Sequence, residues 1–202
     1  GRRRAEEPDL LLFDAGDRFS GTLFYTLHKS RDISMLMNQM DYTAMTLGNH
    51  DFDDGNEELE RFVRSVSAPV LAANVIFPDS SSLSSLILPS TMIEKNGLKI
   101  GLVGLVTEET PHSTAGASEA GFRPLLPYLQ NEVRKLRKKG AVLIIVISHI
   151  GYEKDREIAA AAEGINIIVG GHSHTLLSNS PLEKSEGKYP TIVYAPAVPF
   201  SS

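Results

Sequence analysis

The segment Ala-Val-Leu-Ile-Ile-Val-Ile-Ser-His, residues 141–149, begins with seven apolar residues and ends in His149. A continuous apolar run of this length, rich in β-branched residues, is typical of a strand buried on both faces of a sheet. Apolar residues at helical spacing predict helices on either side, at residues 125–139 and 152–163. A buried strand between two helices indicates an α/β fold.

The same alternation extends along the rest of the chain. Apolar runs predict further strands at residues 10–13, 43–47, 69–75, 165–169 and 191–194. Apolar residues at helical spacing predict one helix that ends near Asp41 and another at residues 57–67. Asn96-Gly97, between apolar segments 91–93 and 98–106, predicts a hairpin. The serine-rich residues 79–85 predict a surface loop. The chain is therefore expected to form a layered α/β fold with largely buried sheets.

Composition excludes several classes of protein. The 202 residues carry a net charge of −5, which argues against general binding of nucleic-acid polymers through a basic surface. Without cysteine, neither a disulfide framework nor a thiolate metal site can form. No apolar run approaches the length that spans a bilayer. The chain opens in Gly-Arg-Arg-Arg rather than Met, so we expect an internal fragment of a longer protein.

Metal-ligating residue types follow four of the predicted strands. Asp14 and Asp17 follow the strand at 10–13, and Asn49-His50-Asp51 follow the strand at 43–47. His149 ends the strand that begins at residue 141, and His172 and His174 follow the strand at 165–169. Because α/β sheets gather their sites at the carboxyl ends of strands, these side chains are expected to lie together. Asp17 is the candidate bridge between two cations, whereas Asp14 is expected either to contact the metal ligands from behind or to stabilise the turn. Asp51 is expected to accept a hydrogen bond from His50 and fix its tautomer.

Each motif alone also has an ordinary structural explanation. Asp14 to Asp17 can be an Asx turn, and the Asn49-His50 pair can be a turn before a helix capped by Asp53 or Asn56. His149 can be a satisfied core residue, and a His-x-His pair can be an exposed loop. His28 and His112 are expected to be surface residues. Four ligand-bearing strand ends together favour a two-metal hydrolytic centre, and a sulfur-free ligand set suits zinc, manganese, iron or magnesium.

The motifs carry a family resemblance. Asp14-Ala15-Gly16-Asp17 followed by Phe19-Ser20-Gly21-Thr22, then residues 47–53, Glu109-Thr110-Pro111 and residues 169–175, resemble the 5′-nucleotidase/apyrase family of calcineurin-like metallophosphoesterases. The resemblance implies a layered α/β/β/α sandwich, with residues 1–194 as the catalytic domain and 195–202 as a tail.

The resemblance also implies a role for each residue. Asp17 would bridge both metals, Asn49, His149 and His172 would complete one site, and His174 would help hold the other. His50, oriented by Asp51, would stabilise the transition state while the metals activate a water. The cofactors would be two divalent ions; zinc is favoured, and manganese, magnesium and calcium are the alternatives.

Two departures from the family pattern bear on function. The Asp-x-His motif of the family's first strand is absent, and the C-terminal domain that selects the nucleoside is absent too. We therefore expect a fold truncated at its first strand and lacking the substrate domain.

The leading hypothesis is removal of phosphate from extracellular nucleotides by a 5′-nucleotidase or apyrase, with a nucleotide as the small-molecule partner. One alternative is an impaired fragment that acts as a metal- or ligand-binding module. Another is a UDP-sugar hydrolase or 2′,3′-cyclic phosphodiesterase. By resemblance, membrane anchoring and homodimer formation would depend on segments outside this chain.

Overall fold

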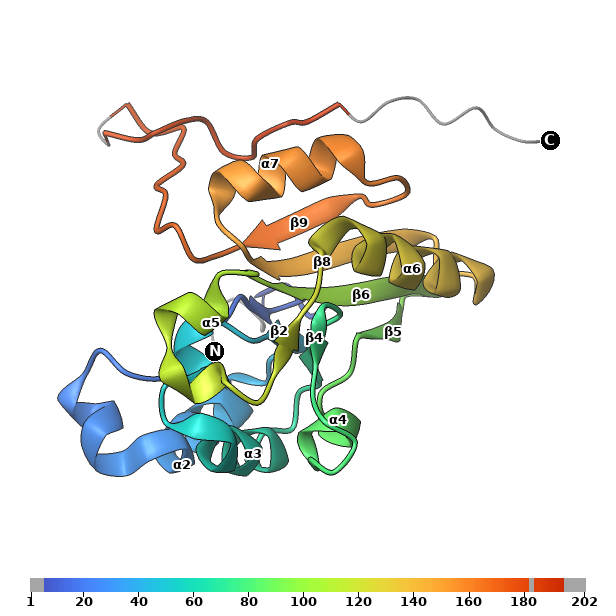
Figure 1. Cartoon of the computed structure of the whole chain (residues 1–202). Helices are drawn as coiled ribbons and strands as arrows, with labels where there is room; N and C mark the ends of the chain where they lie inside the picture. Colours follow the sequence, from blue (N-terminus) through green and yellow to red (C-terminus); the bar gives the residue numbers. More distant parts are fainter. Residues whose placement is uncertain (1–5, 182–183, 195–202) are drawn as a thin grey trace.

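The computed structural model describes residues 6–181 and 184–194, and two sheets form its centre (Figure 1). The first sheet has the parallel order β1-β2-β3, with strands Phe13–Asp14, Ala44–Thr46 and Val70–Leu71. The second has the order β5-β6-β8-β9, with strands Ser90–Lys95, Leu98–Val106, Leu143–His149 and Ile167–Gly170. In this sheet β5 is antiparallel to β6, and the other pairs are parallel. A small antiparallel pair joins β4 (Val75–Ile76) to β7 (Gly121–Phe122).

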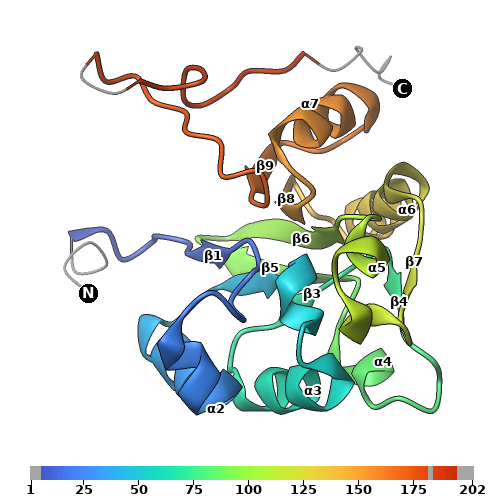
Figure 2. The same ribbon diagram turned by 60° about the vertical axis from the view of Figure 1, so that its left-hand side comes forward.

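Helices cover the outer face of each sheet (Figures 1 and 2). On the first sheet lie α2 (Leu23–Met40) and α3 (Gly55–Ser65), and on the second lie α6 (Leu125–Lys138) and α7 (Tyr152–Ala161). The short helices α4 (Leu83–Leu86) and α5 (Thr110–Ser113) lie in connections. Single 3₁₀ turns form at η1 (Asn49–Phe52) and η2 (Ala115–Ala117). The predicted α/β/β/α layering is confirmed.

The apolar run at residues 141–149 is buried because β8 has a hydrophobic layer on each side. Ile145 and Ile147 pack between the two sheets, together with Leu102 of β6 and Leu71 of β3. Their neighbours Ile144 and Val146 face the opposite way, toward α6 and α7. Successive strand residues point to opposite faces, so a strand with two buried faces is apolar throughout.

Local signals set several element ends as expected. Asp41 ends α2 in a left-handed conformation with φ 55°, and its backbone N–H donates to the Met37 and Asn38 carbonyls. Asn96 and Gly97 have φ values of 51° and 75°, and they join β5 to β6 as the predicted hairpin. The polypeptide is kinked within α2 at Lys29, which sequence periodicity did not indicate.

Three predicted elements differ in the structure. Residues 69–75 do not form one strand, because the segment leaves the first sheet at Leu71 and the Asn74 side chain then bonds both backbone groups of Val106. The predicted loop at 79–85 contains the start of α4. Residues 191–194 were predicted as a strand, but they pair with no strand in the described part of the chain; Ile192 and Tyr194 are 67% and 89% exposed. The tail at 195–202 lies outside the described residues.

Across the two described ranges, none of the helices combines the length and the apolar character that crossing a bilayer requires.

Candidate metal centre

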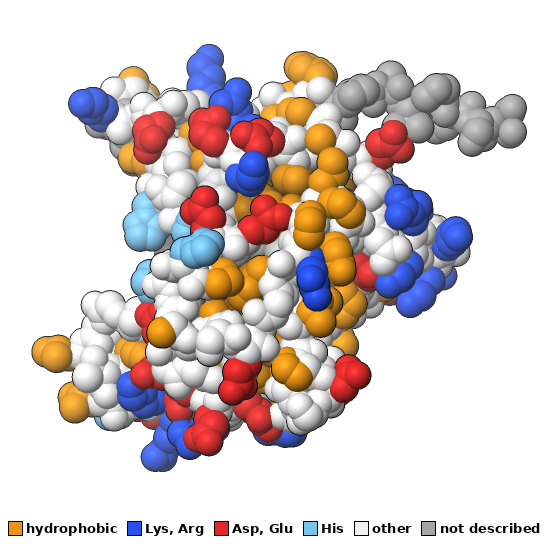
Figure 3. Space-filling view, in the orientation of Figure 1, with side chains coloured by type: hydrophobic (Ala, Val, Ile, Leu, Met, Phe, Trp, Pro, Cys, Tyr) orange, Lys and Arg blue, Asp and Glu red, His pale blue; other side chains and the backbone are white. Residues whose placement is uncertain are grey.

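The predicted ligands come together where the carboxyl ends of β1 and β2 meet those of β8 and β9. The His149 ring Nδ1 lies 2.5 Å from the Ala15 carbonyl oxygen, which joins the second sheet to the first. In Figure 3 most of the visible imidazoles gather at one edge of the molecule, between the upper and lower layers. Ligands contributed by both sheets therefore face the same small volume.

Glycine lets the two loops of the first sheet approach closely. A Cβ atom on Gly48 would lie 2.2 Å from Asp17 Oδ1, and one on Gly16 would lie 2.5 Å from the Gly48 nitrogen. Gly16 also has a φ of +94°, which side chains rarely tolerate. Without side chains at both positions, Asp17 and Asn49 can share one site.

Four acceptor atoms converge in this volume. The Nε2 atom of His149 lies 3.1 Å from Asp17 Oδ2, 3.2 Å from Asn49 Oδ1 and 3.3 Å from His172 Nδ1. His172 Nδ1 lies 3.1 Å from Asn49 Oδ1. His149 is buried, with 2% of its surface exposed, and Asn49 is 4% exposed.

Proton positions make this convergence informative. The Ala15 carbonyl can only accept, so Nδ1 of His149 carries the hydrogen that joins them, and a neutral ring leaves a lone pair on Nε2. That lone pair then faces a carboxylate oxygen and an amide oxygen, which are also acceptors. With the ring neutral, these acceptors face one another, and a cation between them would satisfy all of them.

The ligand set fits a divalent ion. A tetrahedral ion about 2.0–2.1 Å from each ligand separates its ligands by about 3.3 Å. Four of the six ligand separations are 3.1–3.3 Å, which agrees with that geometry. The residues that would hold the ion are Asp17, Asn49, His149 and His172, with nitrogen and oxygen donors that suit zinc or manganese.

The pKa shifts in the cluster also favour a metal. Burial pushes the pKa of Asp17 upward, but the contact with the His149 ring, the backbone N–H of His50 and the His50 ring outweigh it, so its pKa lies below the ordinary value. Burial and repulsion from His149 lower the pKa of His172. An ionised carboxylate and a neutral imidazole are the forms that bind a cation.

His174 is not part of this cluster. Within residues 6–181 and 184–194, the imidazole and carboxylate atoms that could share an ion belong to Asp17, His149 and His172. His174 is exposed, although it follows in the same turn and has a left-handed φ of 52°. Its assignment to a second metal stays a prediction.

His50 lies beside the cluster, and its partner differs from the predicted one. Its backbone N–H donates to Asp17 Oδ1 at 3.0 Å, and its side chain is 46% exposed. The ring Nδ1 lies 2.8 Å from Asp53 Oδ2. The prediction that Asp51 accepts from this imidazole is wrong, because the 3₁₀ turn at 49–52 places Asp51 on the inner side and Asp53 next to the ring.

Asp51 instead faces Arg18, a residue that sequence reasoning missed. Arg18 Nη2 lies 2.7 Å from Asp51 Oδ2, and Nη1 lies 2.5 Å from Asp14 Oδ1. Burial raises the pKa of Asp51, and the Arg18 guanidinium opposes that rise. Asp14 also accepts from the Gly16 N–H, which confirms its role in the turn. The available signal was an arginine directly after the candidate ligand Asp17 and four residues after Asp14.

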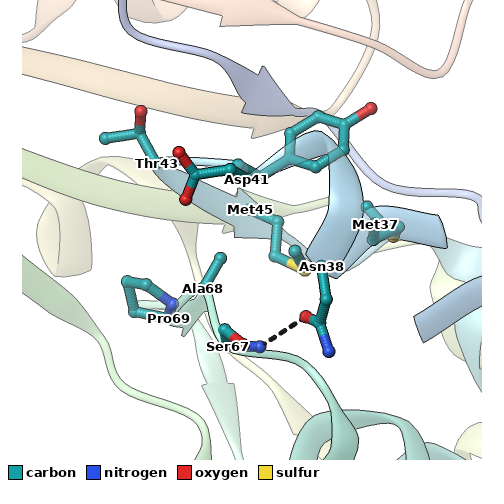
Figure 4. Close-up of a pocket in the computed structure, with 9 residues that line it drawn as sticks. Met37, Asn38, Asp41, Thr43, Met45, Ser67, Ala68 and Pro69 are labelled. Carbon is teal, nitrogen blue, oxygen red and sulfur yellow. Dashed lines mark hydrogen bonds between the residues drawn. The ribbon is translucent and has the colours of Figure 1, made fainter. Parts of the chain in front are cut away.

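The remaining candidate features lie elsewhere. His28 and His112 are exposed, as predicted. A pocket of about 190 Å³ lies between the end of α2 and the starts of β2 and β3, where the Ser67 N–H donates to the Asn38 side chain (Figure 4). Pockets for drug-sized ligands usually measure about 300–1,000 Å³. The pocket is smaller than that and lies at the amino ends of the strands, opposite the ligand cluster.

Known proteins share these features. The family model described as "Calcineurin-like phosphoesterase" matches residues 2–176. A 5′-nucleotidase of Mus musculus is 40% identical over 198 residues, covering 95% of this chain and 34% of the mouse protein. The crystal structure of a 5′-nucleotidase precursor from Thermus thermophilus is 35% identical with a TM-score of 0.92, covering 96% of this chain and 39% of that one. The structure of Haemophilus influenzae NAD nucleotidase is 34% identical with a TM-score of 0.90, covering 96% of this chain and 35% of that one.

The chain spans about a third of the length of the curated relatives it matches. The matched part contains both sheets and all four strand ends that carry the ligands. By this match, and by a fold shared with solved nucleotidases, the chain belongs to the calcineurin-like phosphoesterase family.

Proposed function

We propose that the site hydrolyses phosphate esters or anhydrides of nucleotides, as a 5′-nucleotidase or apyrase does. The observation that carries the proposal is that Asp17 Oδ2, Asn49 Oδ1 and His172 Nδ1 all lie 3.1–3.3 Å from His149 Nε2. The relatives named as nucleotidases support the substrate class. Zinc suits the ligand set best, and His174 with Asp17 would contribute to a second ion.

When bound, divalent ions supply positive charge for the phosphoryl oxygens and a water nucleophile at neutral pH. Asp17 and Asn49 would present their side-chain oxygens to that charge. The hydrogen bond from His149 Nδ1 to the Ala15 carbonyl fixes the orientation of the imidazole ring. The site lies at a surface edge, so a terminal phosphate group can enter it from solvent.

His50 is suited to act on the substrate directly. Asp53 accepts from Nδ1, which leaves Nε2 as the ring atom available to a ligand. The hydrogen bond to Asp53 raises the pKa of His50, which favours the protonated ring. A cationic N–H donor beside the phosphate would stabilise the charge that develops in the transition state and protonate the leaving oxygen. Asp51 supports this residue through the backbone rather than through its ring.

One feature of the ligand cluster also supports the alternative that the chain acts as a metal-binding module. The described residues assemble four donors for one ion, whereas His174 stands outside that cluster. A chain that binds one ion tightly without catalysing hydrolysis would have this arrangement.

The deciding experiment is zinc content per chain, measured together with phosphate release from AMP and ADP and with cleavage of UDP-glucose to UMP and glucose 1-phosphate. Asp17→Ala is expected to lose both zinc and turnover. His50→Ala is expected to keep zinc and lose about 10²–10⁴-fold in turnover. His28→Ala is the matched control, because His28 is 48% exposed and its Nδ1 also lies 2.8 Å from an aspartate, Asp32.

The outcomes separate the alternatives. Phosphate release from AMP or ADP that His28→Ala keeps and His50→Ala loses supports the nucleotidase or apyrase. Cleavage of UDP-glucose to UMP and glucose 1-phosphate, without phosphate release from AMP or ADP, indicates the sugar-nucleotide hydrolase. One zinc ion without turnover indicates the binding module, and loss of zinc in His50→Ala overturns the role assigned to that residue.

An extracellular location remains an expectation from the family resemblance. Homodimer formation and membrane anchoring likewise remain expectations from the family resemblance, and the matched relatives are about three times as long as this chain.

A further inference from the structure

The guanidinium of Arg18 is buried directly behind the ligand cluster. Only 5% of its side chain is exposed, and it stacks on Phe62 with 4.8 Å between Cζ and the ring centroid. Nη2 donates to Asp51 and to the Thr46 carbonyl at 2.7 and 2.9 Å, while Nη1 donates to Asp14. One planar group therefore joins the end of β1, the end of β2 and the loop after β2.

Asp51 links Arg18 to the loop after β2, which carries Asn49. Its carboxylate is fully buried and accepts from the Arg18 backbone N–H at 3.0 Å and from the Gly48 N–H at 2.8 Å. The ligand Asn49 and the exposed His50 lie between Gly48 and Asp51 in the sequence. The ligand Asp17 immediately precedes Arg18. The Arg18–Asp51 pair thus connects the residues that flank both ligands.

The backbone of the first sheet does not reach these loops. The ladder between β1 and β2 consists of the pairs Phe13–Ala44 and Asp14–Met45, so it stops before Asp17 and Asn49. A buried ion pair costs desolvation free energy unless it is well bonded, and Arg18 Nε has no partner within the described residues. Burying such a group is better explained if it has a role beyond stability.

We propose that Arg18 is a positioning residue of the metal centre, which sets the separation of Asp17 and Asn49 by clamping Asp51. The inference rests on the proposed metal centre and not on the identity of the substrate.

Arginine is needed at this position because the contacts require a fork. Two nitrogens of one plane reach Asp14 on one side and Asp51 with Thr46 on the other. A lysine keeps the charge and the stem, but its single ammonium cannot hold both sides in that plane. Arg18→Lys therefore tests positioning while leaving both carboxylates a cation.

The experiment measures Zn²⁺ affinity by competition with a chelating dye, together with the visible absorption of the Co²⁺-loaded protein. The variants are Arg18→Lys, Asp51→Asn and the double variant. Arg18→Lys is expected to lower Zn²⁺ affinity by about 10–100-fold, as outer partners of metal ligands typically do. Because both residues act through one contact, the double variant should lose little more Zn²⁺ affinity than the single variant with the larger loss.

The control is Glu132→Gln on α6. Glu132 is also buried and accepts from Ser90 and Lys135 at 2.6 Å, but it lies on the outer face of the second sheet. It is expected to lower the melting temperature with Zn²⁺ affinity and the Co²⁺ spectrum unchanged. A loss of Zn²⁺ affinity in this control would mean that general destabilisation explains the Arg18 effect, and it would overturn the inference.

The inference is also overturned if folded Arg18→Lys binds Zn²⁺ as tightly as the unmodified chain, or if the losses of the two single variants multiply in the double variant. The measurement uses no nucleotide. A chain that binds Zn²⁺ but releases no phosphate therefore disproves the proposed reaction alone, and normal Zn²⁺ binding by Arg18→Lys in an active chain disproves the positioning role alone.

Discussion

The two sheets contribute equally to the ligand cluster but hold their ligands in different ways. The first sheet supplies Asp17 and Asn49 from strands of two and three residues. The second supplies His149 and His172 from strands of seven and four residues. His149 lies within the parallel ladder itself, opposite Val106, and its carbonyl accepts from the Thr107 N–H. Backbone hydrogen bonds thus position His149 and, through the Gly171 N–H to the Ser148 carbonyl, the residue before His172, whereas glycine contacts and side-chain bonds position Asp17 and Asn49.

This contrast predicts where the site is sensitive to substitution. In the first sheet, a single added or removed side chain displaces a ligand. In the second, backbone hydrogen bonds hold His149 and the residue before His172, so the ligands are expected to stay in place when nearby side chains are shortened. The following predictions run from the largest expected effect to the smallest.

Gly48→Ala should disrupt the centre most severely. Its Cβ would lie 2.2 Å from Asp17 Oδ1 and 2.4 Å from the Asp17 nitrogen. The loops must separate, so Zn²⁺ affinity is expected to fall by about 100-fold or more, beyond the loss that outer contacts typically cause. Gly121→Ala is the control, because the nearest atom that its Cβ would meet is 3.7 Å away. Unchanged affinity in Gly48→Ala would show that the first sheet tolerates movement of its loops.

Leu102→Ala should lower stability without altering the site. Leu102 is fully buried between the sheets, and removing its side chain is expected to cost about 2–5 kcal/mol of unfolding free energy. Denaturant unfolding measures that loss, and Zn²⁺ titration at low temperature measures the site. If Zn²⁺ affinity of the folded protein fell in parallel, packing between the sheets and not the ladder would position His149.

Asp155→Asn tests a buried acid behind the second sheet. Burial raises the pKa of Asp155 to about 6, and a Cβ on Gly170 would lie 2.1 Å from its carboxylate. The native state therefore binds more protons than the unfolded state between about pH 4 and 6, and unfolding free energy falls as pH rises through that window. Asparagine does not titrate, so the variant should gain stability relative to the unmodified chain from pH 4 to 7, by at most about 3 kcal/mol.

The measurement for Asp155 is denaturant unfolding at several pH values in the presence of a chelator. Glu153→Gln, on the same helix and 75% exposed, should reproduce the pH profile of the unmodified chain. A gain for Asp155→Asn that did not depend on pH would exclude titration of this carboxyl as its cause.

Ser173→Ala should have the smallest effect, although Ser173 adjoins His172. Its hydroxyl accepts from the Tyr152 N–H at 3.0 Å and bonds Thr175 at 2.8 Å. An exposed hydrogen bond contributes about 0.5–1 kcal/mol, so Zn²⁺ affinity should change by less than about fivefold. A larger loss in a Zn²⁺ titration would show that the second sheet also depends on side chains to place its ligands.

The sequence predicted the strands with two buried faces and the ligands at their ends. Ile144 to Ile147 could be assigned because alternating burial on two sides requires an unbroken apolar run. Residues 191–194 were assigned wrongly because the same local pattern forms a strand only beside a partner, and the described residues supply none there. The contact between His50 and Asp51 was also wrong, since neighbours in a 3₁₀ turn point in different directions.

The sequence by itself determined the layered α/β class and the candidate ligands Asp17, Asn49, His149 and His172, because each follows a local apolar run that predicts the end of a strand. Only the tertiary structure decided which of these atoms meet, that His174 lies outside the cluster, and that Arg18 joins Asp14 to Asp51. Those contacts connect residues from 4 to 134 positions apart in the chain. Their distances depend on how two sheets pack, which no local pattern specifies.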